Sequence, residues 1–84
     1  MSPLTNQYNE IKAKYPDALI LFKVGDGYIA IQQDAIRIAD CLGTILTEEN
    51  DGDISTEFPF RSLDTFLPKL VRAGNRVAIC ERSF

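Results

Sequence analysis

Hydrophobic residues recur along the chain with two different spacings, and these spacings predict its secondary structure. Three segments have apolar residues three or four positions apart, as on one face of a helix. They cover residues 2–15, 34–42 and 62–73. Five shorter segments are continuously apolar or alternate, which is typical of strands. They cover residues 18–24, 28–31, 44–47, 54–60 and 76–81. The predicted order is helix, strand, strand, helix, strand, strand, helix, strand.

Proline, aspartate and glycine residues mark several of the predicted ends. Pro16 disfavours helical geometry at Tyr15, so the first helix should end there. Asp34 is expected to cap the second helix, and Gly43 supplies its left-handed stop. Pro68 conflicts with the third helical pattern because proline removes a backbone donor, so we expect a kink or a late start of that helix.

This order of elements predicts an α/β fold, α+β-like, with a single mixed β-sheet flanked by about three helices. The segment 18–24 is apolar except for Lys23 and should be a strand buried on both faces. The short turn at residues 25–27 favours an antiparallel hairpin with the next strand. Residues 1–84 are expected to form one domain, standing alone or as a piece of a longer chain, because two cores need more residues.

The composition is that of a globular domain, with 45% apolar and 25% charged residues. The absence of a long apolar run and of a leader pattern predicts a cytoplasmic location and no membrane partner. The chain has no histidine, so we expect no metal site, no cofactor and no catalytic residue. Cys41 and Cys80 lie far apart in the sequence and are expected to be free buried thiols, with one disulfide as the alternative.

Two segments carry a family signal, namely residues 15–28, where an apolar strand meets Gly-Asp-Gly, and residues 67–81. Together with Asp34-Ala35, Leu46-Thr47 and Phe58-Pro59-Phe60, in this order, they resemble the N-terminal mismatch-recognition domain (domain I) of MutS DNA mismatch repair proteins. The resemblance covers essentially the whole chain. It implies a domain I-like fold and a role in DNA mismatch repair. The chain has no G-x-x-x-x-G-K-[ST] phosphate loop, so the family ATPase cannot reside in it.

The chain departs from this family in the segment that reads mispaired bases. MutS proteins have Gly-Asp-Phe-Tyr-Glu, in which the Phe wedges into the minor groove and the Glu bonds the mispaired base. The corresponding positions here are Gly25, Asp26, Gly27, Tyr28 and Ile29. A glycine cannot offset the cost of unstacking a base step, and an isoleucine cannot accept a hydrogen bond.

An ordinary tight hairpin turn is therefore the favoured interpretation of residues 25–27. We expect Tyr28 to pack against the first helix, with a residual stacking contact to DNA as the alternative. If the loop still faces a groove, restoring Phe at Gly27 and Glu at Ile29 should raise the preference for mismatched DNA.

The formal net charge of −3 opposes nonspecific binding to nucleic acid. Five basic residues nevertheless form a candidate face for phosphate contacts, with an ordinary solvated surface as the alternative. They are Lys23, Arg61, Lys69, Arg72 and Arg76. The acidic segment 48–53 lacks the ligand series of a calcium loop and is expected to be a solvated turn.

Two functions are consistent with these observations. The first is a DNA-binding module that contacts double-stranded DNA weakly and nonspecifically through its backbone, without base-specific mismatch readout. The alternative is a degenerate MutS-fold module that binds another MutS-like domain or a different protein, and no DNA. Neither function makes the chain an enzyme, because no nucleophile and base can be paired.

Overall fold

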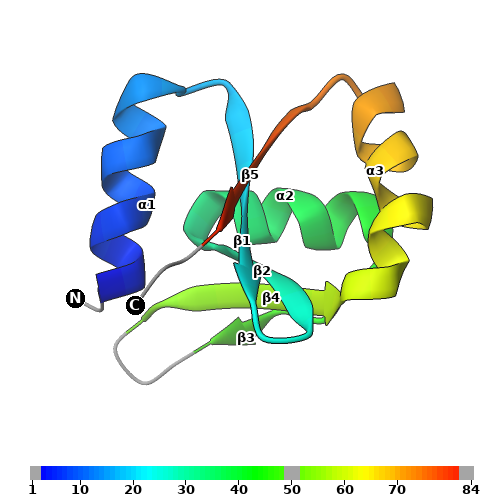
Figure 1. Cartoon of the computed structure of the whole chain (residues 1–84), viewed down its shortest axis with the longest axis horizontal. Coiled ribbons are helices and arrows are strands. Elements are labelled where there is room, and N and C mark those ends of the chain that lie inside the picture. Colours follow the sequence, from blue (N-terminus) through cyan, green and yellow to red (C-terminus); the bar gives the residue numbers. More distant parts are fainter. Residues whose placement is uncertain (1–2, 49–51, 82–84) are drawn as a thin grey trace.

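The computed structural model describes residues 3–48 and 52–81 and shows helices on both faces of one sheet (Figure 1). The predicted order of elements is confirmed. The helices α1, α2 and α3 are Pro3–Lys14, Gln32–Leu42 and Leu63–Arg72. The strands β1 to β5 are Ala18–Val24, Gly27–Ile31, Thr47–Glu48, Ile54–Pro59 and Arg76–Glu81. A 3₁₀ turn, Phe60–Ser62, leads into α3.

The sheet is mixed, as predicted, with strand order β3-β4-β2-β1-β5. Strand β1 runs antiparallel to β2, with Phe22 opposite Ile29, which confirms the predicted hairpin. It runs parallel to β5, with Ala18 opposite Arg76. Helix α1 packs on one face of the sheet, and α2 and α3 pack on the other.

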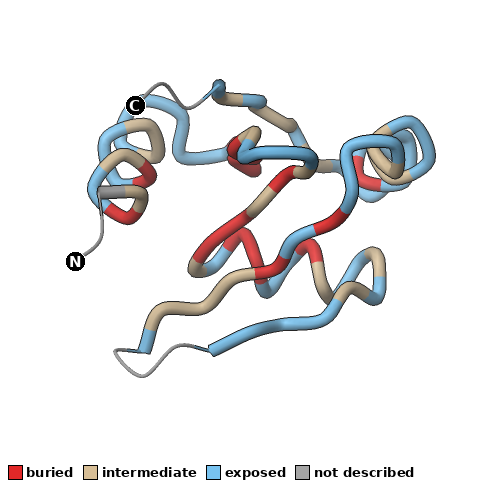
Figure 2. The backbone as a smooth tube through the Cα atoms, turned by 60° about the horizontal axis from the view of Figure 1, so that its bottom comes forward, coloured by how far each residue is buried: buried red, intermediate tan, exposed pale blue. Residues whose placement is uncertain are grey.

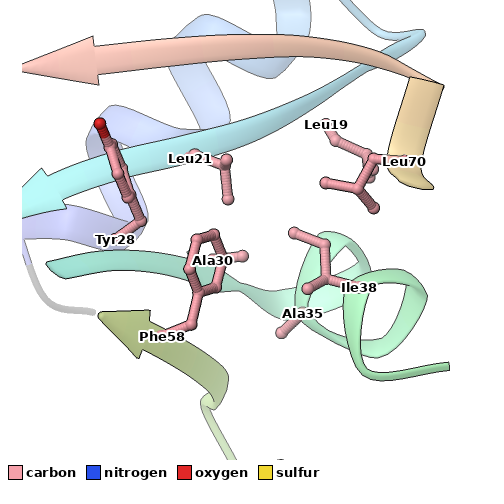
Figure 3. Packing of buried hydrophobic residues seen from close by; sticks show 8 residues of the cluster. All are labelled: Leu19, Leu21, Tyr28, Ala30, Ala35, Ile38, Phe58 and Leu70. Carbon is pink, nitrogen blue, oxygen red and sulfur yellow. The ribbon is translucent and has the colours of Figure 1, made fainter. Parts of the chain in front are cut away.

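Strand β1 is buried on both faces, as its apolar run predicts. Leu19 and Leu21 point toward α2 and α3, whereas Ile20 and Phe22 point toward α1. The larger cluster brings together side chains from three strands and two helices (Figure 3). Its buried members are Leu19, Leu21, Tyr28, Ala30, Ala35, Ile38, Phe58 and Leu70. Figure 2 shows that the buried residues lie mainly in the central strands and on the inner sides of the helices.

The segment 44–47 was predicted to be a strand, but the third strand is only Thr47–Glu48. The hydroxyl of Thr56, a residue that is 1% exposed, lies 2.8 Å from Thr44 Oγ1 and 2.9 Å from the carbonyl oxygen of Ile45. The Thr56 side chain therefore occupies the backbone carbonyl oxygen of Ile45, which a strand would pair through its backbone. The Ile45 side chain is left 83% exposed.

Three further expectations about side chains and helix ends are wrong. The spacing of apolar residues in 2–15 placed Tyr15 on the apolar face of the first helix. Tyr15 instead lies beyond the end of α1 and is 60% exposed. Helix α3 begins at Leu63 and contains Pro68 in its interior, so the expected late start is wrong, whereas the alternative, a kink at Pro68, stays a prediction. Cys41 and Cys80 are free thiols, as predicted, but Cys41 is exposed and Cys80 is half-buried. Partial burial raises the pKa of the Cys80 thiol.

The central part of the acidic segment, residues 49–51, lies outside the described residues. In the ranges 3–48 and 52–81, no helix is long and apolar enough to cross a membrane.

Asp34 does not cap α2, contrary to expectation. Ile31 occupies the cap position without a side-chain hydrogen bond, and Asp34 lies in the first turn, only 3% exposed. Its carboxylate accepts hydrogen bonds from the backbone N–H of Ile20 at 3.0 Å and from Lys12 Nζ at 2.8 Å. Lys12 Nζ also donates to the carbonyl oxygen of Ala18 at 2.6 Å.

Ile20 needs a side-chain acceptor because the β1–β2 ladder ends at the pair Phe22 and Ile29. Beyond that pair β2 continues to Ile31 paired with β4, and the chain then turns into α2 at Gln32, which has a left-handed φ of +57°. The Asp34 carboxylate accepts the hydrogen bond that a backbone carbonyl of β2 would otherwise accept from Ile20. One buried carboxylate therefore joins α1, β1 and α2.

Replacing Asp34 with Asn should lower the free energy of unfolding by about 2–3 kcal/mol, because Lys12 would lose the anion that compensates its partial burial. Urea denaturation measures this loss. Glu81→Gln is the matched control, because Lys23 and Glu81 form an exposed pair at 3.7 Å whose removal should cost less than about 0.5 kcal/mol. Equal losses in the two variants would contradict this role of Asp34.

Tyr8 adds a pH dependence to the same region. Burial, and then the negative charge of Asp34, raise the pKa of Tyr8 above 10.0. The unfolded chain therefore releases this proton first, so stability is full below about pH 10 and falls as pH rises through the folded-state pKa. Tyr8→Phe should flatten this alkaline decline in urea denaturation, whereas exposed Tyr15→Phe should leave it in place. An unchanged decline in Tyr8→Phe would refute the assignment.

Candidate nucleic-acid interface

Strands β1 and β2 are joined by a two-residue turn, Gly25 and Asp26. Gly25 has a φ of +59°, which suits the first position of a tight hairpin turn of the II′ kind. Gly27 is already part of β2 and pairs with Val24 and with Pro59 of β4. The observed turn is thus one residue shorter than the predicted turn at residues 25–27.

Gly27 is required by the close approach of β4. A Cβ atom at this position would lie 2.7 Å from the backbone carbonyl oxygen of Phe58. Real Cβ contacts are longer than this, and a backbone oxygen in a paired strand cannot rotate away as a flexible side chain can. The position that holds the wedge aromatic in MutS proteins therefore accepts no side chain here unless β4 moves.

Gly27 and Ile29 lie on the α1 side of the sheet, where half-buried Ile29 packs beside the smaller apolar cluster. Ile29 is directly opposite Glu57 on β4. A shallow depression of about 520 Å³ next to the turn has two carboxylates, Asp26 and Glu57, and no basic residue among its lining residues. This face of the hairpin repels phosphate rather than attracting it.

Tyr28 does not pack against α1, contrary to expectation. Strand alternation places it on the opposite face from Ile29, where it is 6% exposed. Its ring stacks on Phe60 with centroids 5.2 Å apart and an interplanar angle of 8°, and it also contacts Phe58 at 5.7 Å. Because its ring is buried among these neighbours, Tyr28 offers no free face to a base.

Two of the five candidate phosphate-binding residues lie at the hairpin end of the sheet. Lys23 Nζ is 5.0 Å from the Phe60 ring centroid and 3.7 Å from the carboxylate of Glu81. Arg61 is exposed in the 3₁₀ turn and lines a small hollow that also contains Asp26. Each of these cations therefore lies near a carboxylate.

The other three candidates lie away from the hairpin. Lys69 and Arg72 are in the last turn of α3, and Arg76 begins β5 opposite Ala18, whereas Lys23 is opposite Glu81. The five residues therefore do not form one face. The sequence analysis also missed Lys14, which lines a hollow together with Arg76. Lys14 lies shortly before the start of β1, and Arg76 begins β5. The parallel pairing of these two strands brings both residues to one hollow, and the sequence does not show this pairing.

Within the part of the chain that the structure describes, no group of three or more Cys, Asp and Glu residues is arranged to hold a metal ion. The fold and site define a small mixed-sheet domain with carboxylates beside the β1–β2 turn and with a hollow lined by Lys14, Asp17 and Arg76 where β1 and β5 begin.

The chain belongs to the MutS domain I family, whose family model matches residues 2–83. It is 53% identical over 85 residues to the DNA mismatch repair protein MutS of Christiangramia forsetii, with 98% of the chain covered. The identity is 54% to the MutS of Flavobacterium johnsoniae and 46% to that of Salinibacter ruber, each covering 96% of the chain. The chain spans only 9–10% of the length of these curated relatives.

The close approach of β4 makes a prediction about Gly27. Gly27→Ala should lower the free energy of unfolding by about 1–3 kcal/mol, and Gly27→Phe by at least as much, because β4 must shift. The double variant Gly27→Phe with Ile29→Glu would then disturb the packing of the hairpin, and this disturbance would oppose any gain in mismatch preference. Urea denaturation tests this, with exposed Asp26→Ala as the control, expected within about 0.5 kcal/mol of the unmodified chain. A Gly27→Ala variant of unchanged stability would contradict it.

Proposed function

We propose that this chain is a DNA mismatch repair module that contacts the backbone of duplex DNA without reading the mispaired base. Family membership over residues 2–83 carries this proposal, together with relatives that are named DNA mismatch repair protein MutS. The family resemblance supplies the DNA partner. Because Gly and Ile stand at positions 27 and 29 of the hairpin, the proposed contact lacks base readout.

The chemistry of the residues at positions 27 and 29 supports the loss of base readout. Gly27 offers no ring to fill an unstacked base step, and Ile29 has no polar atom for a base edge. The carboxylates of Asp26 and Glu57 beside them would meet phosphate oxygens with like charge. Backbone contact must therefore come from basic residues elsewhere on the domain.

The second candidate function is a protein-interaction module that binds no DNA. The acidic balance of the chain, with a net charge of −3, favours it, because this charge opposes the approach of a nucleic acid. The chain also represents about a tenth of its relatives' length, so such a module would join other MutS-like domains or a different protein.

A fluorescence-anisotropy titration with matched and mismatched duplexes separates the two functions. Backbone binding should be measurable at about 20 mM salt and should weaken steeply with added salt, by several hundredfold for a tenfold increase if about three phosphates are contacted. The affinities for matched and mismatched duplexes should agree within about twofold, because no group reads the base. Absence of binding at low salt would favour the protein-interaction module, and a strong mismatch preference would refute the loss of readout.

A further inference from the structure

Strand β5, drawn in red in Figure 1, forms one edge of the sheet. It pairs with β1 on one side, and within residues 3–48 and 52–81 no strand or loop forms a backbone hydrogen bond with its other side. The N–H and C=O groups of an open edge form a row to which another extended strand can add. The free side of β5 is therefore a candidate interaction surface.

Strand β5 lacks the features that usually protect a sheet edge from such pairing, which are short length, proline, a bulge or charged residues along the strand. The opposite edge is protected by its length, because β3 has only two residues. Strand β5 has six residues and no proline, and its four central residues, 77–80, are uncharged. Its pairing with β1 runs without a bulge from Arg76 to Glu81. The edge is therefore regular and open to a further strand.

The side chains of β5 alternate between the two faces of the sheet. Val77 packs against the larger cluster on the side of α2 and α3, whereas Cys80 packs against the smaller cluster on the side of α1. Ile79 therefore lies on the same face as Val77, and it is 44% exposed. Residues directly opposite each other in an antiparallel pair share a face, so a two-fold axis at Ala78 would place Val77 opposite Ile79 of a second copy. This pairing would cover an exposed apolar side chain on each copy.

The ends of β5 carry opposite charges, which favours an antiparallel second copy as the added strand. Arg76 begins the strand and Glu81 ends it. With the axis at Ala78, Arg76 lies opposite Cys80 of the second copy and one position away from its Glu81. The two charged side chains belong to opposite faces, so they attract each other across the ends of the strands without forming a defined ion pair. A parallel copy in the same register would instead bring like charges together.

We infer that a second copy of this chain adds to the β5 edge in the antiparallel direction and joins the two sheets into one about a two-fold axis. This contact is separate from the proposed DNA contact. It is closed, because the edges that remain are the two short β3 strands. A single pair of strands buries less surface than a standard interface, so the dissociation constant should be on the order of 100 μM.

Sedimentation equilibrium of the full 84-residue chain, over concentrations that bracket this constant, tests the inference. The average mass should rise from one copy to two and no further. Hydrogen exchange at the backbone amides of residues 77–79 should become slower over the same range, because the added strand protects the open edge. A mass of one copy at every concentration, or a mass that rises beyond two copies, would overturn the inference.

A matched pair of variants tests whether β5 is the contact. Ile79→Lys should raise the dissociation constant by about tenfold or more, because it places a charge at the centre of the strand pair. Ile45→Lys is the control, since it makes the same change at a residue that is 83% exposed just before β3, and it should stay within about twofold. Circular dichroism checks that both variants are folded. Equal weakening in the two variants would overturn the assignment to β5.

Charge reversal tests the antiparallel direction. Arg76→Glu and Glu81→Arg should each raise the dissociation constant by about two- to fivefold, because like charges then meet at the ends of the paired strands. The variant that combines both changes has the net charge of the unmodified chain and should return to within about twofold of its dissociation constant. A combined variant as weak as the single variants, or weaker, would overturn the antiparallel pairing.

Discussion

The buried carboxylate of Asp34 is the interaction on which the arrangement of the domain depends. Its desolvation costs several kcal/mol, and this cost is offset because the carboxylate receives the Lys12 ammonium and the Ile20 N–H at the point where β1 loses β2 as a partner. Lys12 also holds the carbonyl oxygen of Ala18. The end of α1 and the start of β1 are thereby fixed to each other. These elements also carry Lys14 and Ala18, which line one hollow with Arg76, so the geometry of that hollow is tied to the same carboxylate.

A second constraint acts at the other end of the sheet, where β2 and β4 approach too closely for any side chain at Gly27. On the opposite face of the hairpin, the stack of Tyr28 and Phe60 and the hydrogen bond from the Phe60 N–H to the Asp26 carbonyl oxygen hold the turn against the end of β4. The hairpin therefore has a packing role of its own. The close approach of β4 leaves no room for a larger side chain at position 27.

Local sequence patterns predicted the order of elements, the hairpin and the burial of β1, because each depends on residues close together in the chain. They failed for Asp34, which has the residue type of a helix cap but accepts a hydrogen bond from the backbone N–H of Ile20 in β1, fourteen positions earlier. They failed for Tyr28 because the face that it occupies depends on where α1 and α3 pack. Lys14 and Arg76 come together only through the parallel pairing of β1 with β5, which no short pattern reports.

A net charge of −3 does not describe how charge is distributed over this domain. Asp26 and Glu57 line the depression beside the β1–β2 turn, whereas Lys14 and Arg76 line a hollow where β1 and β5 begin. These two places are separated by the length of β1, about 20 Å, which is more than two Debye lengths at physiological salt. A charged ligand at one end therefore experiences little of the field of the other end, so the local charge matters more there than the net charge of the chain.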